Sequence, residues 1–243
     1  MSISTSLQTT ARQAGGVYLL ILVLAPLNEF FLKARFVVKG DAATTAQRIA
    51  AEPLLYRLGI FSDFVSHVAF LCLALLLYHL FRDVARPLAR GLVALVAMSV
   101  AIGMIALVCR LAPLILLDPA SFLSVFSAAE RAALALFFLR LGSAATVLAT
   151  FFWGFWLLPF GSLVIKSRFY PKLLGLLLIV GGVTYAVLGF ANLVFPAYGP
   201  VVFKFGMPFY AIGEVAIIFW LLFATARVPE TPAGLPAAAV RAD

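Results

Sequence analysis

The sequence predicts an all-α fold, a polytopic integral membrane bundle of six transmembrane helices, and two observations carry this prediction. Of the 243 residues, 64% are hydrophobic and 12% are charged, and the mean hydropathy is +1.10. An ordinary globular chain is about 45–50% apolar and about 25% charged. The hydrophobic residues also form continuous runs, whereas the strands of a membrane β-barrel alternate apolar and polar residues.

Six runs reach the length of about 20 mostly apolar residues that a helix needs to cross a bilayer. A polar N-terminus, residues 1–13, precedes the first run without a small-x-small cleavage site, so we expect a retained span rather than a signal peptide. The Pro/Ala-rich tail, residues 227–243, has the composition of a disordered segment. The expected spans, which together form a transmembrane domain over residues 14–226, are 14–32, 60–81, 91–111, 135–158, 173–193 and 206–226.

The distribution of basic residues predicts the orientation of the bundle. An even number of spans places both chain ends on one side of the membrane. The two short connections at residues 82–90 and 166–172 are dense in Lys and Arg, and short basic loops mark the cytoplasmic side. We therefore expect the N-terminus and the C-terminal tail to be cytoplasmic.

Capping signals locate two helix starts outside the spans. Asp41 can cap a short helix over about residues 42–52, which Pro53 would end and which we expect on the outer membrane surface. Ser127 and Glu130 have the spacing of a capping box, so the fourth long helix should begin near residue 128.

Proline and glycine predict two further features. Pro159 and Gly161 should kink the fourth long helix near residues 159–165. Small residues allow close helix packing in membranes, but membrane helices are also generally enriched in glycine. Both interpretations apply to the glycines of the fifth span, Gly175, Gly181, Gly182 and Gly189.

The formal charge of +8 does not indicate a nucleic-acid partner. Lys and Arg lie at the ends of apolar runs rather than on one patch or among aromatic residues, which is typical of loops held against lipid headgroups. The two cysteines, Cys72 and Cys109, lie within or at the end of apolar runs, where they are small apolar fillers rather than a disulfide framework.

Asp63 and His67 are four residues apart and share one face of the second span. A carboxylate bound to one ring nitrogen would orient the imidazole and leave the other nitrogen for a ligand, a proton or a metal. Counting about 1.5 Å per residue from the basic anchors places further polar residues at a similar depth. The predicted ligand-binding tier in the outer half of the membrane consists of Glu29, Asp63, His67, Arg110, Arg140, Asn192 and Glu214.

Most members of this tier also have a structural interpretation. The two arginines can extend to the headgroups, Glu29 can face water, and His67 can be a packed core residue. Asp63 can cap its helix or pair with Arg57. Glu214 is the hardest to explain in this way, because an intramembrane carboxyl group usually pairs with a partner or lines a cavity.

The sequence also resembles a family of bacterial six-span membrane proteins, domain of unknown function 4386. The resemblance rests on ARQAGGVYLL (11–20), VVKGDAATTAQRIAAEPLLYRLGIFSDF (37–64), LYHLFRDVARPLA (77–89), the segment from FFWGFWLLPFG to VGGVTY (151–185) and GEVAIIFWLL in the sixth span. It implies a multi-pass protein of the bacterial inner membrane and implies no activity or catalytic residue.

The polar tier favours the binding of a lipid or small molecule in an outward-facing pocket between helices. One alternative is an intramembrane enzyme that acts on a lipid, with His67, Asp63 and Glu214 as catalytic candidates. The others are a proton-coupled transporter and a structural or regulatory subunit of a membrane-protein partner.

The pattern does not decide whether the protein is an enzyme, and it indicates no cofactor. With two histidines in the chain, His67 and His79, one chain cannot supply a three-histidine zinc site. We therefore expect no metal, and the alternative is a carboxylate-rich site of His67, Asp63 and Glu214.

Overall fold

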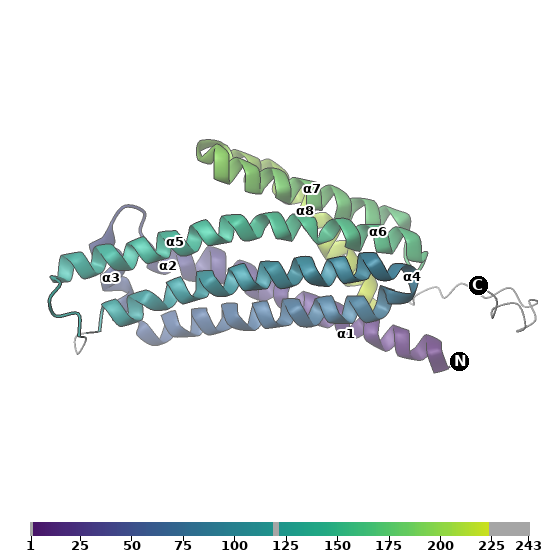
Figure 1. Ribbon diagram of the computed structural model, residues 1–243, viewed down its shortest axis with the longest axis horizontal. Helices are drawn as coiled ribbons and strands as arrows, with labels where there is room; N and C mark the ends of the chain where they lie inside the picture. Colours follow the sequence, from purple (N-terminus) through teal and green to yellow (C-terminus); the bar gives the residue numbers. More distant parts are fainter. Residues whose placement is uncertain (1, 119–121, 224–243) are drawn as a thin grey trace, which may run out of the picture.

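Every regular element in the described part of the chain, residues 2–118 and 122–223 of a computed structural model, is helical (Figure 1). Five helical stretches are long and apolar enough to cross a membrane, which confirms the predicted all-α membrane bundle. The elements are α1 (Ser2–Pro26), the π-helix η1 (Leu27–Leu32), α2 (Lys33–Phe36), α3 (Ala42–Ala51), α4 (Pro53–Leu116), α5 (Ala128–Phe155), α6 (Leu157–Ser167), α7 (Lys172–Val194), the 3₁₀-helix η2 (Pro196–Tyr198) and α8 (Gly199–Phe223).

Helix α4 is a hairpin of two long legs. Its 64 residues include one with non-helical backbone, Ala85, at φ −158° and ψ 88°. Pro87 follows two residues later and cannot donate a hydrogen bond to the preceding turn. The legs then run back along each other, so that His67 in the first contacts Gly103 in the second. The predicted spans 60–81 and 91–111 are therefore the two legs of α4.

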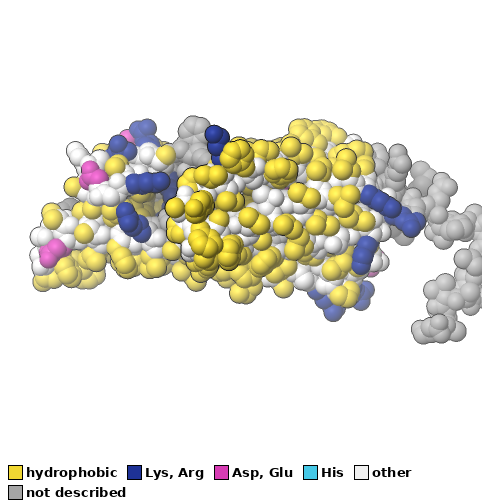
Figure 2. Space-filling view, turned by 90° about the horizontal axis from the view of Figure 1, so that it is seen from above, with side chains coloured by type: hydrophobic (Ala, Val, Ile, Leu, Met, Phe, Trp, Pro, Cys, Tyr) yellow, Lys and Arg dark blue, Asp and Glu magenta, His cyan; other side chains and the backbone are white. Residues whose placement is uncertain are grey.

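The two ends of the bundle differ in composition. The start of α1, the bend of α4 and the junction of α6 with α7 lie at one end, here named the terminal end (Figure 1). Gly15 of α1 packs there against Leu222 of α8. The short helix α3 lies at the opposite end, here named the α3 end. Charged side chains gather at both ends of a largely hydrophobic middle (Figure 2), as expected of a multi-pass membrane protein.

The chain ends differ in part from the expectation. Helix α1 begins at Ser2, well before residue 14, and Ala11 and Ala14 are buried in the bundle. Most of the predicted polar N-terminus is therefore helical. The predicted disordered tail, residues 227–243, lies outside the described residues.

Two apolar cores stabilise the bundle. The larger lies towards the terminal end and includes Leu77, Phe81 and Phe160, each fully buried. The smaller lies at the α3 end and joins α2, α3, α4 and α5 through six buried side chains: Phe36, Ile49, Tyr56, Ile60, Leu107 and Leu139. Helix α3 is thus packed against the bundle through these side chains.

Both predicted helix starts are confirmed. Asp41 accepts hydrogen bonds from the backbone N–H of Thr44, at 2.9 Å, and from the Thr44 hydroxyl, at 2.6 Å. These donors hold the pKa of the Asp41 carboxyl below its usual range. Ser127 and Glu130 form a reciprocal capping box, and α5 begins at Ala128.

The predicted kink lies slightly earlier than residues 159–165. Helix α5 ends at Phe155 and α6 begins at Leu157, with Trp156 between them. Pro159 lacks an N–H for the carbonyl group of Phe155, and its ring crowds that carbonyl. The break is therefore at Trp156, three residues before the proline, and not at the proline itself.

The glycines of α7 do allow close helix packing. A Cβ atom added at Gly175 would lie 2.5 Å from the carbonyl oxygen of Gly161, and one added at Gly182 would lie 2.7 Å from that of Gly154. On the other side of α7, a Cβ at Gly181 would lie 3.1 Å from the Cα of Tyr210 in α8. Close packing is thus the role of these three glycines.

Candidate functional site

The polar residues predicted to form one tier fall into separate groups. Asp63 and Arg110 form an ion pair between the two legs of α4, with 2.5 Å between Oδ2 and Nη1. Both side chains are mostly enclosed, at 23% and 20% exposed. The partner of Asp63 is therefore Arg110 rather than Arg57.

His67 lies beside this pair but is not bound by the Asp63 carboxylate. Its Nδ1 is 2.8 Å from the backbone carbonyl oxygen of Asp63. A carbonyl only accepts hydrogen bonds, so Nδ1 carries the proton in this contact. The other nitrogen, Nε2, packs against Gly103, because a Cβ atom added there would lie only 1.8 Å from it. The imidazole is thus held between the legs of α4.

We expect Gly103→Ala to lower the free energy of unfolding by about 1–2 kcal/mol, because the new methyl group must displace the imidazole. The combined variant Gly103→Ala/His67→Ala should recover most of this loss, since it removes the group that the methyl meets. Chemical unfolding of the purified protein in detergent measures both. Strictly additive effects of the two substitutions would contradict this packing.

Three other predicted residues make only local contacts or none. Glu29 pairs with Lys33 one helical turn away, at 2.6 Å, and is 55% exposed. Asn192 donates to the carbonyl oxygen of Leu188 in its own helix, at 3.0 Å. Arg140 is exposed and has no hydrogen bond or ion pair within the described ranges. None of the three joins the Asp63–Arg110 pair.

Glu214 lies at a different depth from Asp63. Its Oε2 accepts a 2.6 Å hydrogen bond from the hydroxyl of Tyr18 in α1. Further along the same chain segment, Asn28 donates to Ser62, the neighbour of Asp63. Tyr18 precedes Asn28 by ten residues, or about 15 Å of helix. Glu214 is therefore closer to the terminal end than Asp63 by about this distance.

This separation bears on the alternative metal and catalytic site of His67, Asp63 and Glu214. The three residues do not come together. Helix α8 begins at Gly199 rather than at residue 206, so Glu214 is further from the start of its helix than predicted and lies at another depth than Asp63 and His67. In the residues that the structure describes, no three His, Cys, Asp or Glu side chains lie close enough to hold one metal ion.

Aromatic residues that the sequence analysis did not single out surround Glu214. Tyr185 of α7 also lies close to the carboxyl group. Tyr210 stacks on Tyr185 with ring centres 4.2 Å apart, and Trp156 contacts Tyr18 at 5.8 Å. Of these rings, only that of Tyr210 could have been predicted near Glu214 from the sequence, because it lies one turn before Glu214 and the others come from different helices.

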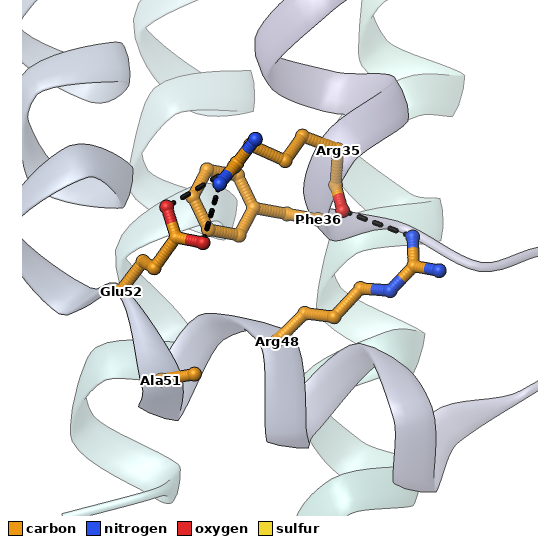
Figure 3. A pocket seen from close by; sticks show the side chains of 5 residues that line it. All are labelled: Arg35, Phe36, Arg48, Ala51 and Glu52. Carbon is orange, nitrogen blue, oxygen red and sulfur yellow. Dashed lines mark hydrogen bonds and ion pairs between the residues drawn. The ribbon is translucent and has the colours of Figure 1, made fainter.

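An open hollow at the α3 end was also missed. It has a volume of about 330 Å³ and is lined by Arg35 and Phe36 of α2, Arg48 and Ala51 of α3, and Glu52 (Figure 3). The Arg35 guanidinium donates two hydrogen bonds to the Glu52 carboxylate, at 2.6 and 3.1 Å. Arg48 donates one, from Nη1 to the backbone oxygen of Arg35, at 3.0 Å.

The chemistry of this hollow favours an anion. Two guanidinium groups and one carboxylate leave the lining with a net positive charge. Arg48 uses one nitrogen on the backbone, and the rest of its guanidinium makes no hydrogen bond or ion pair within the described ranges. Guanidinium groups bind phosphate and carboxylate in a two-point geometry. The arginines of the segments KARF and AQRIAAE were the only sequence signal for this hollow. The two segments come together because α3 folds back against α2, which the sequence does not reveal.

Comparison with known proteins identifies the family and no closer relative. A search of the curated proteins finds no match, and a search of the solved structures finds none either. The family model of domain of unknown function DUF4386 matches residues 13–224, from near the middle of α1 to the end of α8. The match covers most of the chain, so this protein belongs to the DUF4386 family.

Proposed function

We propose that the protein binds an anionic lipid or small amphiphile through the hollow between α2 and α3. The observation that carries the proposal is a cavity of about 330 Å³ with two arginines in its wall. This volume is at the lower end of the range of ligand sites, about 300–1,000 Å³. It suits a phosphate- or carboxylate-bearing headgroup rather than a whole lipid.

An apolar surface beside the hollow supports an amphiphilic ligand. Helix α4 begins directly after Glu52, and its first turns expose Leu54, Leu58 and Phe61, at 70%, 53% and 62%. These residues follow the i, i+4, i+7 spacing of one helix face. An acyl chain along this face would place its headgroup near the arginines.

The binding step exchanges one charge partner for another. Arg35 is held by Glu52, whereas Arg48 has free donors that a ligand can engage first. Both members of the Arg35–Glu52 pair are substantially exposed, at 56% and 40%, so their attraction is weakened by water. A ligand phosphate can therefore displace the Glu52 carboxylate at little cost.

The two short, densely basic loops support an outer location for the α3 end, in a bacterial inner membrane, as part of this proposal. The enzyme alternative has less support, because Asp63 is held by Arg110 and the ring nitrogens of His67 face a carbonyl oxygen and Gly103. In the hollow, by contrast, Arg48 retains donors that are not used within the protein.

We expect Arg48→Ala to weaken binding of phosphatidylglycerol about tenfold, the effect of losing roughly one charge-assisted hydrogen bond. Native mass spectrometry of the purified protein can measure this, with phosphatidylcholine of the same acyl chains as the neutral comparison. Glycerol phosphate, which has no acyl chains, distinguishes a lipid from a soluble anion as the ligand.

Arg57→Ala is the matched control, because Arg57 is an exposed arginine of the same region that does not line the hollow. It removes the same charge and should leave affinity nearly unchanged. Equal losses in the two variants, or equal binding of the two lipids by the unchanged protein, would contradict a specific site.

A further inference from the structure

Glu214 is a carboxyl group within the bundle that the proposed headgroup site does not use. It belongs to α8, which packs mainly against α7 and α1. It lies nine residues before Phe223 and faces Tyr18 across the α1–α8 contact. The neighbouring helix positions, Gly213, Ile217 and Ile218, are buried. Glu214 itself is half-buried, and its carboxyl group lies against the phenol of Tyr18 at this contact.

The groups that face Glu214 from each neighbouring helix are phenols. Tyr18 comes from α1, Tyr185 from α7 and Tyr210 from α8 itself. No Lys, Arg or His side chain of the described residues forms an ion pair with it. This differs from Asp63 and Glu52, each of which has an arginine partner.

A carboxylate in such surroundings is unfavourable. A charge in hydrocarbon without a counter-charge is strongly disfavoured, and an acid in that position takes up a proton instead. The neutral acid, in contrast, fits the observed contacts. One oxygen accepts the hydrogen bond of Tyr18, and the acid's own hydroxyl can donate to a nearby phenol oxygen such as that of Tyr185.

We propose that Glu214, Tyr18 and Tyr185 form a proton-binding site inside the membrane, in which Glu214 carries the proton in this structure. The site joins α1, α7 and α8 through one neutral hydrogen-bonded group. Loss of the proton leaves a negative charge at the α1–α8 contact, so the protonation state and the packing of these helices are coupled. The site is independent of the headgroup hollow at the α3 end.

Infrared difference spectroscopy of the full chain in lipid tests this assignment. We expect the wild-type minus Glu214→Gln spectrum at neutral pH to contain the C=O band of a carboxylic acid. An exposed glutamate, with an ordinary pKa of about 4.3, is ionised there. Glu29→Gln is the matched control, because Glu29 is exposed and paired with Lys33. Its difference spectrum should contain carboxylate bands alone.

Two further measurements separate a proton-binding site from a static structural contact. Tyr18→Phe should shift the frequency of the Glu214 band, because it removes the donor to Oε2. Alkaline titration should convert the band fully to carboxylate, and transfer to deuterated water should shift it. Carboxylate bands alone for Glu214 at neutral pH would overturn the proposal. So would an acid band that neither titrates nor exchanges with deuterium.

Discussion

Arg110→Ala is expected to lower the free energy of unfolding by about 2–4 kcal/mol. The substitution leaves the Asp63 carboxylate between the legs of α4 without its partner, and removing one member of a buried ion pair typically costs about 3–5 kcal/mol. About a fifth of each side chain is exposed, so water compensates for part of the loss. Arg110 also supplies the backbone oxygen that accepts the Tyr56 hydroxyl bond, at 2.8 Å, and alanine keeps that contact.

The charge-exchanged variant Asp63→Arg/Arg110→Asp is the control for this prediction. It keeps the opposite charges at the two positions and should recover at least half of the stability that Arg110→Ala loses. Chemical unfolding of the purified protein in detergent measures both variants. A loss below about 0.5 kcal/mol, the range of an exposed surface pair, would show that the two legs do not depend on this contact.

Gly175→Ala is expected to destabilise the bundle by about 2–3 kcal/mol, in the upper range of overpacking effects. The new methyl group would lie 2.5 Å from the backbone oxygen of Gly161 and equally close to the Ile165 side chain. The Ile165 side chain can rotate, but the carbonyl oxygen belongs to the backbone of α6. Helices α6 and α7 must therefore move apart.

Gly16→Ala is the matched control in a membrane helix, because a Cβ atom at Gly16 meets nothing within 4 Å. Alanine is the better helix former, so this variant should be neutral or slightly stabilising. Thermal unfolding in the same detergent compares the two directly. Similar melting temperatures for both variants would contradict the tight packing between α6 and α7.

The architecture could be predicted because its signals are local. Apolar runs of membrane length, the cap at Asp41 and the capping box of Ser127 and Glu130 depend on residues close together in the sequence, and each has its counterpart in the structure. The kink near Pro159 was expected at the proline, although the backbone bond that proline removes belongs to Phe155. Its existence was predictable, and its position differs for a physical reason.

The arrangement of the polar side chains could be predicted only in part, because it depends on contacts between helices. The depth of Glu214 was counted from a span start at residue 206, and the helix begins at Gly199. The pairing of Asp63 with Arg110 joins residues 47 positions apart, and the phenols around Glu214 come from three helices. Periodicity in one sequence carries no information on such distant contacts.

The unequal lengths of the helices determine how the bundle fits a bilayer. Helix α7 has 23 residues, or about 34 Å, while the first leg of α4 has a length of about 48 Å at the same rise per residue. The hydrocarbon layer is about 30 Å thick. Helices α4 and α5 are therefore longer than the hydrocarbon layer is thick, and the excess length is at the end that carries the Arg35–Glu52 pair. Helices α7 and α8 match the layer. Thickening of the bilayer would bring the headgroup plane towards α3 without stretching the α7–α8 hairpin.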